Sequence, residues 1–259
     1  MTVLPLQSTI LYGPVRSRRL GRSLGINLMS CDYKVCSFNC VYCHYGWTDR
    51  LTLDVHKCVD DLPRSEEVVK AVEGALRSSV EIDFLTFSGN GEPTLYPGFA
   101  QLVDEIVGIR DMHRPELKIA LLSNSTGLGD ENVRRCVRKI DVPVFKLDVG
   151  TEGKFRAINR PAEGVEFEEI LDYLASLEGI CLQTALFEGT PSNVSEEDLT
   201  HYFGCVRQVK PAEVHIYSID RPVPQSNIMR VSREKLDRIA LLGEKETRVR
   251  IRAFSLRDS

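Results

Sequence analysis

The sequence predicts an α/β protein, built as a curved, partly open six-stranded barrel of (β/α)6 type. Strand-like and helix-like segments alternate along the chain with almost no long linker, which is the pattern of a parallel sheet covered by helices. The strand-like runs 84–87 and 120–122 are apolar on both faces, as a sheet buried by helices requires. Six β/α units are too few for the closed eight-stranded barrel.

The predicted strands and helices follow one another in chain order. The strands are expected at 24–29, 82–88, 117–123, 142–149, 180–187 and 213–219, with an edge strand at 248–254. Ser65 is the expected N-cap of the first helix, and Ser195 and Ser232 open the fifth and sixth. Apolar residues at helical spacing mark the helices between them: Phe99, Leu102, Ile106 and Ile109; Val133, Cys136, Val137 and Ile140; Ile170, Leu171, Leu174 and Leu177.

Length and composition fit an ordinary globular chain. The 259 residues leave room for one or two domains, and α/β barrels of this length often form one. The sequence contains no repeat, low-complexity stretch or Pro/Ser-rich hinge. We therefore expect a single domain over 1–259, with its core at about 24–222 and a C-terminal helix and edge strand over 223–259.

Charge and apolar patterning exclude or disfavour several protein classes. No apolar run approaches the ~20 residues that span a bilayer, and the first residues lack the pattern of a secretion signal. With 33 Lys+Arg against 37 Asp+Glu, the net charge of −4 does not favour a nucleic-acid partner, although local basic clusters leave RNA open. Eight cysteines without a secretion signal indicate reduced thiols, so we expect a cytoplasmic protein without a membrane partner.

Three cysteines lie close together in a long loop that follows the first predicted strand. Cys36, Cys40 and Cys43 form a C-x3-C-x2-C run just past the carboxyl end of that strand, where parallel α/β sheets bind ligands. Three thiolates on a four-iron cluster leave one iron open to a ligand, as three-ligand metal sites do. The run therefore predicts an iron–sulfur centre that takes part in chemistry.

A zinc knuckle completed by Cys31 or His44 is the alternative, but structural zinc sites usually pair two separated C-x2-C units. The other cysteines are scattered. Cys136, Cys181 and Cys205 lie in apolar surroundings, so we expect plain burial for them, and the role of Cys58 stays open.

The cysteine loop resembles that of the radical S-adenosylmethionine (radical SAM) superfamily. Members carry C-x3-C-x-aromatic-C after the first strand of a partial (β/α)6 barrel, and Tyr42 occupies the aromatic position here. The resemblance implies a [4Fe–4S] cluster held by Cys36, Cys40 and Cys43, with S-adenosylmethionine on the open iron. It also implies that Tyr42 lies against the adenine of that cofactor.

A glycine-containing segment closes the second predicted strand. The run Gly89-Asn90-Gly91-Glu92-Pro93 is not a dinucleotide fingerprint, because Thr94 replaces the third glycine and Pro93 interrupts the turn. Glycines there let the backbone approach a ligand closely. In the family a Gly-Gly-Glu segment receives the amino group of S-adenosylmethionine. The resemblance assigns that role to the backbone of this run and to Glu92, although Asn90 departs from the family pattern.

Polar residues also lie on the later predicted strands. Asn124 and Ser125 suit a turn or a helix cap, and the resemblance places them near the ribose hydroxyls of the cofactor. Lys146 and Asp148 share one face of the fourth strand, either as a structural ion pair or in contact with the cofactor. Side chains for which both a ligand-binding and a structural role stay open are Arg160, Gln183, Thr184, His215 and Tyr217.

Taken together, the motifs look like the small stand-alone radical SAM branch related to the wybutosine-pathway tRNA enzyme, 4-demethylwyosine synthase. Only Cys31 lies upstream of the loop, and one cysteine cannot hold the second cluster of that enzyme. The resemblance implies reductive cleavage of S-adenosylmethionine to a radical that abstracts hydrogen from an unidentified substrate. It also implies an external one-electron reductant, ferredoxin or flavodoxin. The alternatives are an activase that places a glycyl radical on a protein, and a non-enzymatic zinc or iron–sulfur protein.

Overall fold

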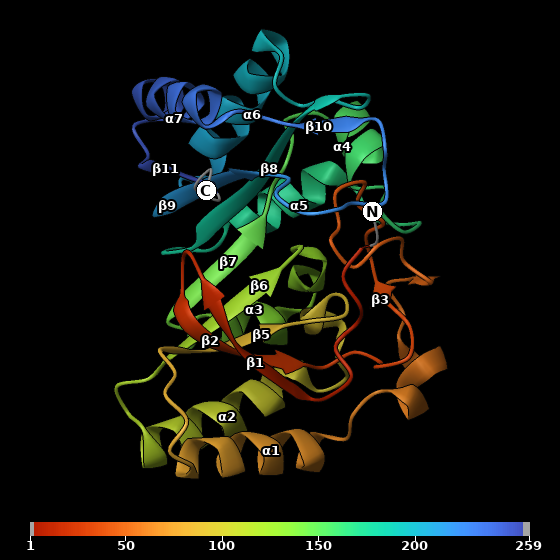
Figure 1. Ribbon diagram of the computed structural model, residues 1–259, viewed down its shortest axis with the longest axis vertical. Helices are drawn as coiled ribbons and strands as arrows, with labels where there is room; N and C mark the ends of the chain where they lie inside the picture. Colours follow the sequence, from red (N-terminus) through yellow and green to blue (C-terminus); the bar gives the residue numbers. More distant parts are fainter. Residues whose placement is uncertain (1–2, 256–259) are drawn as a thin grey trace. The chain divides into compact units, whose positions relative to one another are not determined.

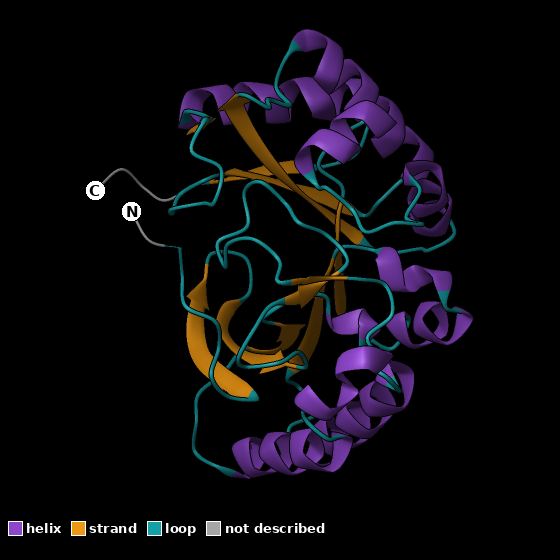
Figure 2. Ribbon diagram, turned by 90° about the vertical axis from the view of Figure 1, so that its right-hand side faces the viewer, coloured by secondary structure: helices purple, strands orange, loops and turns teal. Residues whose placement is uncertain are grey.

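The computed structural model describes residues 3–255, which form two compact units. The N-terminal unit comprises Leu6–Ser37 and Thr48–Pro143, and the C-terminal unit comprises 3–5, Phe38–Trp47 and 144–255. In each unit the helices lie against the strands (Figure 1, Figure 2).

The N-terminal unit is built on a four-stranded sheet. Its strands are β1 (Leu11–Ser17), β2 (Gly21–Asn27), β5 (Phe84–Ser88) and β6 (Lys118–Ser123), in that order. β1 is antiparallel to β2, and β2, β5 and β6 run parallel. The helices are α1 (Ser65–Arg77), α2 (Phe99–His113) and α3 (Glu131–Val137), with short 3-10 turns η1 (His56–Asp61), η2 (Pro93–Leu95) and η3 (Thr126–Gly129). A small second sheet pairs β3 (Val35–Cys36) with β4 (Arg50–Leu51).

The C-terminal unit also has a mainly parallel sheet. β7 (Val142–Lys146), β8 (Cys181–Gly189), β9 (Glu213–Ser218) and β11 (Ile251–Phe254) run parallel in this order, and β10 (Ile228–Arg230) adds antiparallel to β8. The helices are α4 (Glu152–Ile158), α5 (Phe167–Ala175), α6 (Glu196–Val209) and α7 (Arg233–Thr247). The C-terminal segment thus contributes a strand and a helix to this unit, and β11 is the edge strand that the sequence predicts at 248–254.

Apolar side chains of the strands and of α2 form the buried core of the N-terminal unit. In the N-terminal unit the fully buried residues Leu85, Phe87 and Leu121 come from β5 and β6, with Leu102 and Ile106 from α2. Phe87 packs edge-on against Phe99 at the start of α2, with ring centroids 5.4 Å apart. Burial of this kind, at roughly 25 cal/mol per Å² of apolar surface, is what holds a helix to a sheet face.

Of the three serines expected to be helix N-caps, two have that role in the structure. The Oγ atoms of Ser195 and Ser232 accept from the backbone N–H groups of Asp198 and Lys235, so both residues cap their helices as predicted. The prediction for Ser65 is wrong, because α1 begins with Ser65 inside it and Arg64 is the N-cap. Glu67 decides this start by accepting a hydrogen bond from the Arg64 N–H, at 3.2 Å.

Several elements of the structure have no counterpart among the predicted ones, among them β1, β10 and α4. β1 is an edge strand whose middle is exposed, so it lacks the apolar alternation that marks a half-buried strand. β10 has only three residues, and α4 has seven. Such short segments carry too few positions for a period to emerge. Within residues 3–255, no helix combines the length and apolar character needed to span a membrane.

Candidate active site

The cysteine loop of the C-terminal unit is anchored on the end of α4. The backbone N–H groups of Asn39 and Val41 donate to the carbonyl oxygens of Asn159 and Ile158, at 2.9 and 3.0 Å. The Cys43 N–H donates to the Cys40 carbonyl at 3.2 Å, closing a turn between these two cysteines. Phe38 packs edge-on against Phe155 of α4. The loop is therefore ordered by backbone bonds and one apolar anchor.

Asp148 is the centre of a buried polar network beside this loop. Its carboxylate accepts from Lys146 Nζ at 2.9 Å, from Asn159 Nδ2 at 2.8 Å and from the Ala185 N–H at 2.8 Å. The Tyr42 hydroxyl also donates to it. The sequence places Lys146 and Asp148 on one face, and of its two readings the structure contains the ion pair. A buried carboxylate with this many donors is well satisfied.

The surroundings of Tyr42 and Lys146 in this network raise the pKa of both residues. Burial and the neighbouring Asp148 charge raise the pKa of Tyr42 well above its usual value. Burial lowers the pKa of Lys146, but the charges of Asp148 and Tyr217 outweigh burial, and the net shift is upward. Lys146 Nζ also donates to the Tyr217 hydroxyl at 3.1 Å. At neutral pH the network therefore contains a neutral Tyr42 and a protonated Lys146.

Asn159 connects this network to the cysteine loop. Its Nδ2 donates to Asp148 and lies 3.6 Å from the Sγ of Cys40, within hydrogen-bond range for sulfur. The sequence points to the neighbouring Arg160 and gives no sign of a role for Asn159. The signal available was its amide side chain in the run Ile158–Pro161, but a lone asparagine at a helix end usually means a cap. Arg160 instead stacks on Trp47, 4.8 Å from the ring centroid.

In the N-terminal unit, Cys36 ends β3 and meets a second asparagine. Asn124 Nδ2 lies 3.6 Å from the Cys36 Sγ and 2.9 Å from the Ser37 Oγ. The Asn124 Oδ1 accepts from the Thr126 hydroxyl, which holds the side-chain amide in this orientation. Asn124, which the sequence points to as a cofactor contact, therefore also lies beside a cysteine sulfur.

Glu92 joins the loops that follow β5 and β6. Its carboxylate accepts from the Thr94 N–H and hydroxyl at 3.1 and 2.6 Å, from the Ser123 hydroxyl at 2.8 Å and from the Asn124 N–H at 2.5 Å. Burial raises the pKa of Glu92, and these donors offset part of the rise. The side chain is 2% exposed, so its direct partners are protein groups and it positions the two loops. Contact between Glu92 and the cofactor stays a prediction.

The glycines of the run 89–93 allow its backbone to pack closely against neighbouring segments. A Cβ on Gly91 would lie 1.6 Å from the Val35 carbonyl oxygen, next to Cys36, and Gly91 forms a bridge with Val35. Gly89 has φ +119° and packs on Asn27. Asn90 exchanges hydrogen bonds with the Gln7 backbone at 2.7 and 2.8 Å. The run thus packs against β3, the strand that ends in Cys36. Pro93 begins the 3-10 turn η2.

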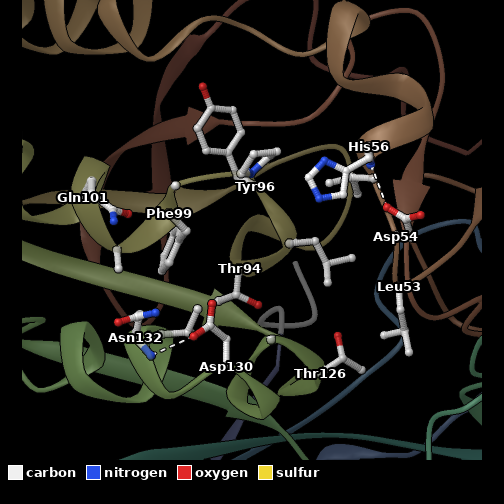
Figure 3. Close-up of a pocket in the computed structure, with 17 residues that line it drawn as sticks. Leu53, Asp54, His56, Thr94, Tyr96, Phe99, Gln101, Thr126, Asp130 and Asn132 are labelled. Carbon is white, nitrogen blue, oxygen red and sulfur yellow. Dashed lines mark hydrogen bonds between the residues drawn. The ribbon is translucent and has the colours of Figure 1, made fainter.

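A pocket of about 570 Å³ opens beside these loops in the N-terminal unit (Figure 3). It is lined by the segment after β4, the loop between η2 and α2, and the start of α3. Asp54 and Asp130 face it, but their carboxylates already accept the N–H groups of His56 and Asn132, at 2.9 and 2.8 Å. Thr94 and Thr126 also line it, so it adjoins the Glu92 and Asn124 contacts.

Ser125, Thr184 and the scattered cysteines occupy a turn, the core and positions of different burial. Ser125 is fully buried with φ +82° and starts η3, so its conformation is that of a turn. Thr184 bonds to the Tyr202 hydroxyl of α6 and belongs to the core. Cys58, Cys136 and Cys205 are buried, as expected for the last two. Cys181 is only partly buried, so the expectation of plain burial is wrong for it.

The cysteine residues and their partners fit an iron–sulfur cluster. Side-chain amides reach the sulfurs of Cys36 and Cys40, and N–H donors to sulfur are what tunes an iron–sulfur centre. In the N-terminal unit, the residues at 89–93 and the pair Asn124 and Ser125 follow the carboxyl ends of β5 and β6, which is the ligand-binding edge of a parallel sheet.

Comparison with known proteins identifies the family. The model of the radical SAM superfamily matches residues 32–189, more than half of the chain. The chain belongs to the radical SAM superfamily. Enzymes of this superfamily use a [4Fe–4S] cluster and S-adenosylmethionine, so these are its cofactors, and they generally depend on an external reductant.

Two relatives match most of this chain. The chain is 33% identical over 227 residues to the UPF0026 protein MJ1312 of Methanocaldococcus jannaschii, covering 85% of this chain and 66% of that protein. It is 27% identical to a protein of Brachyspira hyodysenteriae named GTPase Obg, covering 98% of this chain but only 36% of that protein. The chain thus spans about a third and about two thirds of these two relatives.

Solved structures show the same fold. A radical SAM methyltransferase from Sphaerobacter thermophilus superposes with a TM-score of 0.66 at 12% identity, covering 91% of this chain and 66% of that one. A structure of TYW1 with a lysine–pyruvate adduct gives a TM-score of 0.54 at 16% identity, covering 86% and 73%. The predicted partial-barrel fold class of radical SAM enzymes is therefore confirmed.

Proposed function

We propose that the chain cleaves S-adenosylmethionine reductively and uses the resulting radical to take a hydrogen atom from a substrate. The observation that carries the proposal is the C-x3-C-x2-C run inside the matched family region, with amide donors aimed at two of its sulfurs. When bound, the cluster supplies the electron that cleaves the carbon–sulfur bond and yields a 5′-deoxyadenosyl radical.

Each residue of the proposed site has a separate task. Cys36, Cys40 and Cys43 hold the cluster and leave one iron open. The backbone at 89–92 and the Asn124 amide bind the amino acid and ribose parts of the cofactor, while Glu92 holds both loops in register. Tyr42 lies against the adenine, and its bond to Asp148 orients its ring.

Lys146 has no part in covalent catalysis in this proposal. One structural neighbour carries a lysine–pyruvate adduct. In this chain Lys146 is paired with Asp148, and its pKa is raised, so the amine stays protonated and does not attack a carbonyl. Asp148 and Lys146 instead hold Tyr42 and Asn159 beside the cysteine loop.

The electron comes from a small external carrier, ferredoxin or flavodoxin, and the chain works where thiols stay reduced. The substrate is left open, and activation of a partner protein by a glycyl radical is a second candidate of the same chemistry. The two differ in where the radical ends: on a backbone glycine of a partner, or on a substrate released from the site.

The test is product formation by the reconstituted full-length chain. Reduced with dithionite in the presence of S-adenosylmethionine, it is expected to release 5′-deoxyadenosine and methionine. Cys40→Ala is expected to abolish both products, whereas Cys205→Ala, a buried thiol outside the loop, leaves them unchanged. A colourless, zinc-loaded protein that makes no 5′-deoxyadenosine, or a Cys40→Ala variant that still makes it, would overturn the proposal.

A further inference from the structure

Three side chains with metal-binding donors lie together at the start of β8 and β9. Cys181 is directly opposite Glu213 in the register of the two parallel strands, and His215 follows two residues after Glu213. Because side chains alternate along a strand, all three point to the same face. Thr184, of opposite parity, bonds to Tyr202 of α6, so the cluster faces away from α6.

The donor atoms are close enough for one ion. The Cys181 Sγ, a Glu213 carboxylate oxygen and a His215 ring nitrogen all lie within 4.8 Å of one another. Zinc bonds of about 2.0–2.3 Å put donors roughly 3–4 Å apart, so the widest gap must close by only about 1 Å. The side chains of His215 and Glu213 are 7% and 19% exposed, so these two donors are largely shielded from water.

We propose that Cys181, Glu213 and His215 bind Zn²⁺ at a second site, separate from the cysteine loop. One thiolate, one imidazole and one carboxylate form a mixed donor set of the kind that zinc accepts, and softer or harder ions match it less well. Three protein ligands leave one position of a tetrahedral ion for water or another small ligand.

Neighbouring charges are compatible with the ion. His215 Nε2 and a Glu213 oxygen are hydrogen-bonded to each other, so the proton between them is what the metal displaces. Arg250 and Arg252 approach Glu213 only to 3.7 and 3.8 Å, and their side chains are 69% and 49% exposed. Both guanidinium groups can therefore move into solvent when a cation binds. The thiol of Cys181 loses its proton to the medium on binding.

Zinc binding by the cluster-loaded protein tests this proposal, because the three loop cysteines are then occupied. The holoenzyme is equilibrated with Zn²⁺ against a chromophoric chelator, and the metal is counted by mass spectrometry. We expect one tightly held zinc per chain in the wild type and in Cys205→Ala. In Cys181→Ala and His215→Ala we expect affinity to fall by more than the roughly 10–100-fold that loss of an outer-shell partner costs.

X-ray absorption at the zinc edge gives a readout that a folding defect does not mimic. We expect one sulfur at about 2.3 Å with nitrogen and oxygen neighbours in the wild type, and no sulfur in the milder variant Cys181→Ser. Two or more sulfurs around the zinc would place it elsewhere and overturn the proposal. So would a wild type that binds no zinc, or variants at Cys181 and His215 that keep wild-type affinity.

Discussion

Asn124 and Asn159 each present a side-chain N–H to a cysteine sulfur, Cys36 and Cys40, at 3.6 Å. A donor on a thiolate stabilises the more negative, reduced cluster, so it raises the reduction potential. The two residues come from different strand ends and are held by other bonds, to Thr126 and to Asp148. In the proposed site, with Cys36 and Cys40 as cluster ligands, these two donors would set the reduction potential of the cluster without an extra ligand.

The first prediction concerns this potential. Asn124→Ala and Asn159→Ala are each expected to lower the midpoint potential of the cluster, measured by a spectroscopic redox titration. Asn132→Ala, an exposed residue of α3 whose side chain bonds to no cysteine, serves as control and is expected to leave the potential unchanged. A potential that stays the same or rises in both test variants contradicts the assigned role.

The second prediction concerns the proton on Lys146. Because Asp148 and Tyr217 raise its pKa, the amine is expected to resist acylation until the pH exceeds the ordinary lysine value of about 10.4. In Asp148→Asn the largest contribution that offsets burial is lost, and the pKa of Lys146 falls. Competitive acetylation followed by peptide mass spectrometry measures both. Wild-type Lys146 acylating with a midpoint below that of exposed lysines would refute the pairing.

Sequence alone predicted some of these residues and missed others for a physical reason. Lys146 and Asp148 share a strand face by simple alternation, so their proximity was predictable. Asn159 reaches Cys40 across 119 positions of sequence, and no local pattern encodes that distance. Likewise, Gly91 was expected to make room for a ligand, but the group it makes room for in the structure is the Val35 carbonyl.

At the scale of elements, the glycine-containing run after β5 carries the position of β3. The third prediction follows from the 1.6 Å approach of a Gly91 Cβ to the Val35 oxygen. Gly91→Ala is expected to destabilise the chain by about 1–3 kcal/mol, as overpacking does, and to weaken cluster retention by displacing Cys36. Gly74→Ala is the matched control. Gly74 lies in α1, and a Cβ added there would have nothing within 4 Å beyond its chain neighbours and the backbone of the helix. The substitution should therefore stabilise the folded chain by about 0.5–1 kcal/mol.

Chemical denaturation of the two glycine variants measures both effects. Equal unfolding free energies for Gly91→Ala and the wild type would mean that β3 moves without cost, contrary to this account. Among elements, strands with a continuous apolar run, such as β5 and β6, were predictable, because burial on both faces requires that pattern. β1 was not, because its exposed middle residues are held by pairing with β2 and leave no apolar signature.

At the scale of the whole chain, residues after 222 contribute a paired strand and buried side chains to the C-terminal unit. β11 pairs with β9, and Leu236 of α7 is fully buried. The fourth prediction compares two leucines of α7. Leu236→Ala is expected to cost about 2–5 kcal/mol of stability, whereas Leu241→Ala, 68% exposed, stays within about 0.5 kcal/mol. Equal unfolding temperatures for the two variants would show that packing of α7 does not stabilise the chain.

The central claim is that three thiolates hold a cluster with one iron open to the amino acid part of S-adenosylmethionine. Electron–nuclear double resonance of the reduced cluster with ¹⁵N-labelled S-adenosylmethionine tests it directly. The account predicts a ¹⁵N hyperfine coupling that is present in the wild type and absent without the cofactor. A reduced four-iron cluster with no such coupling in the presence of saturating cofactor would contradict it.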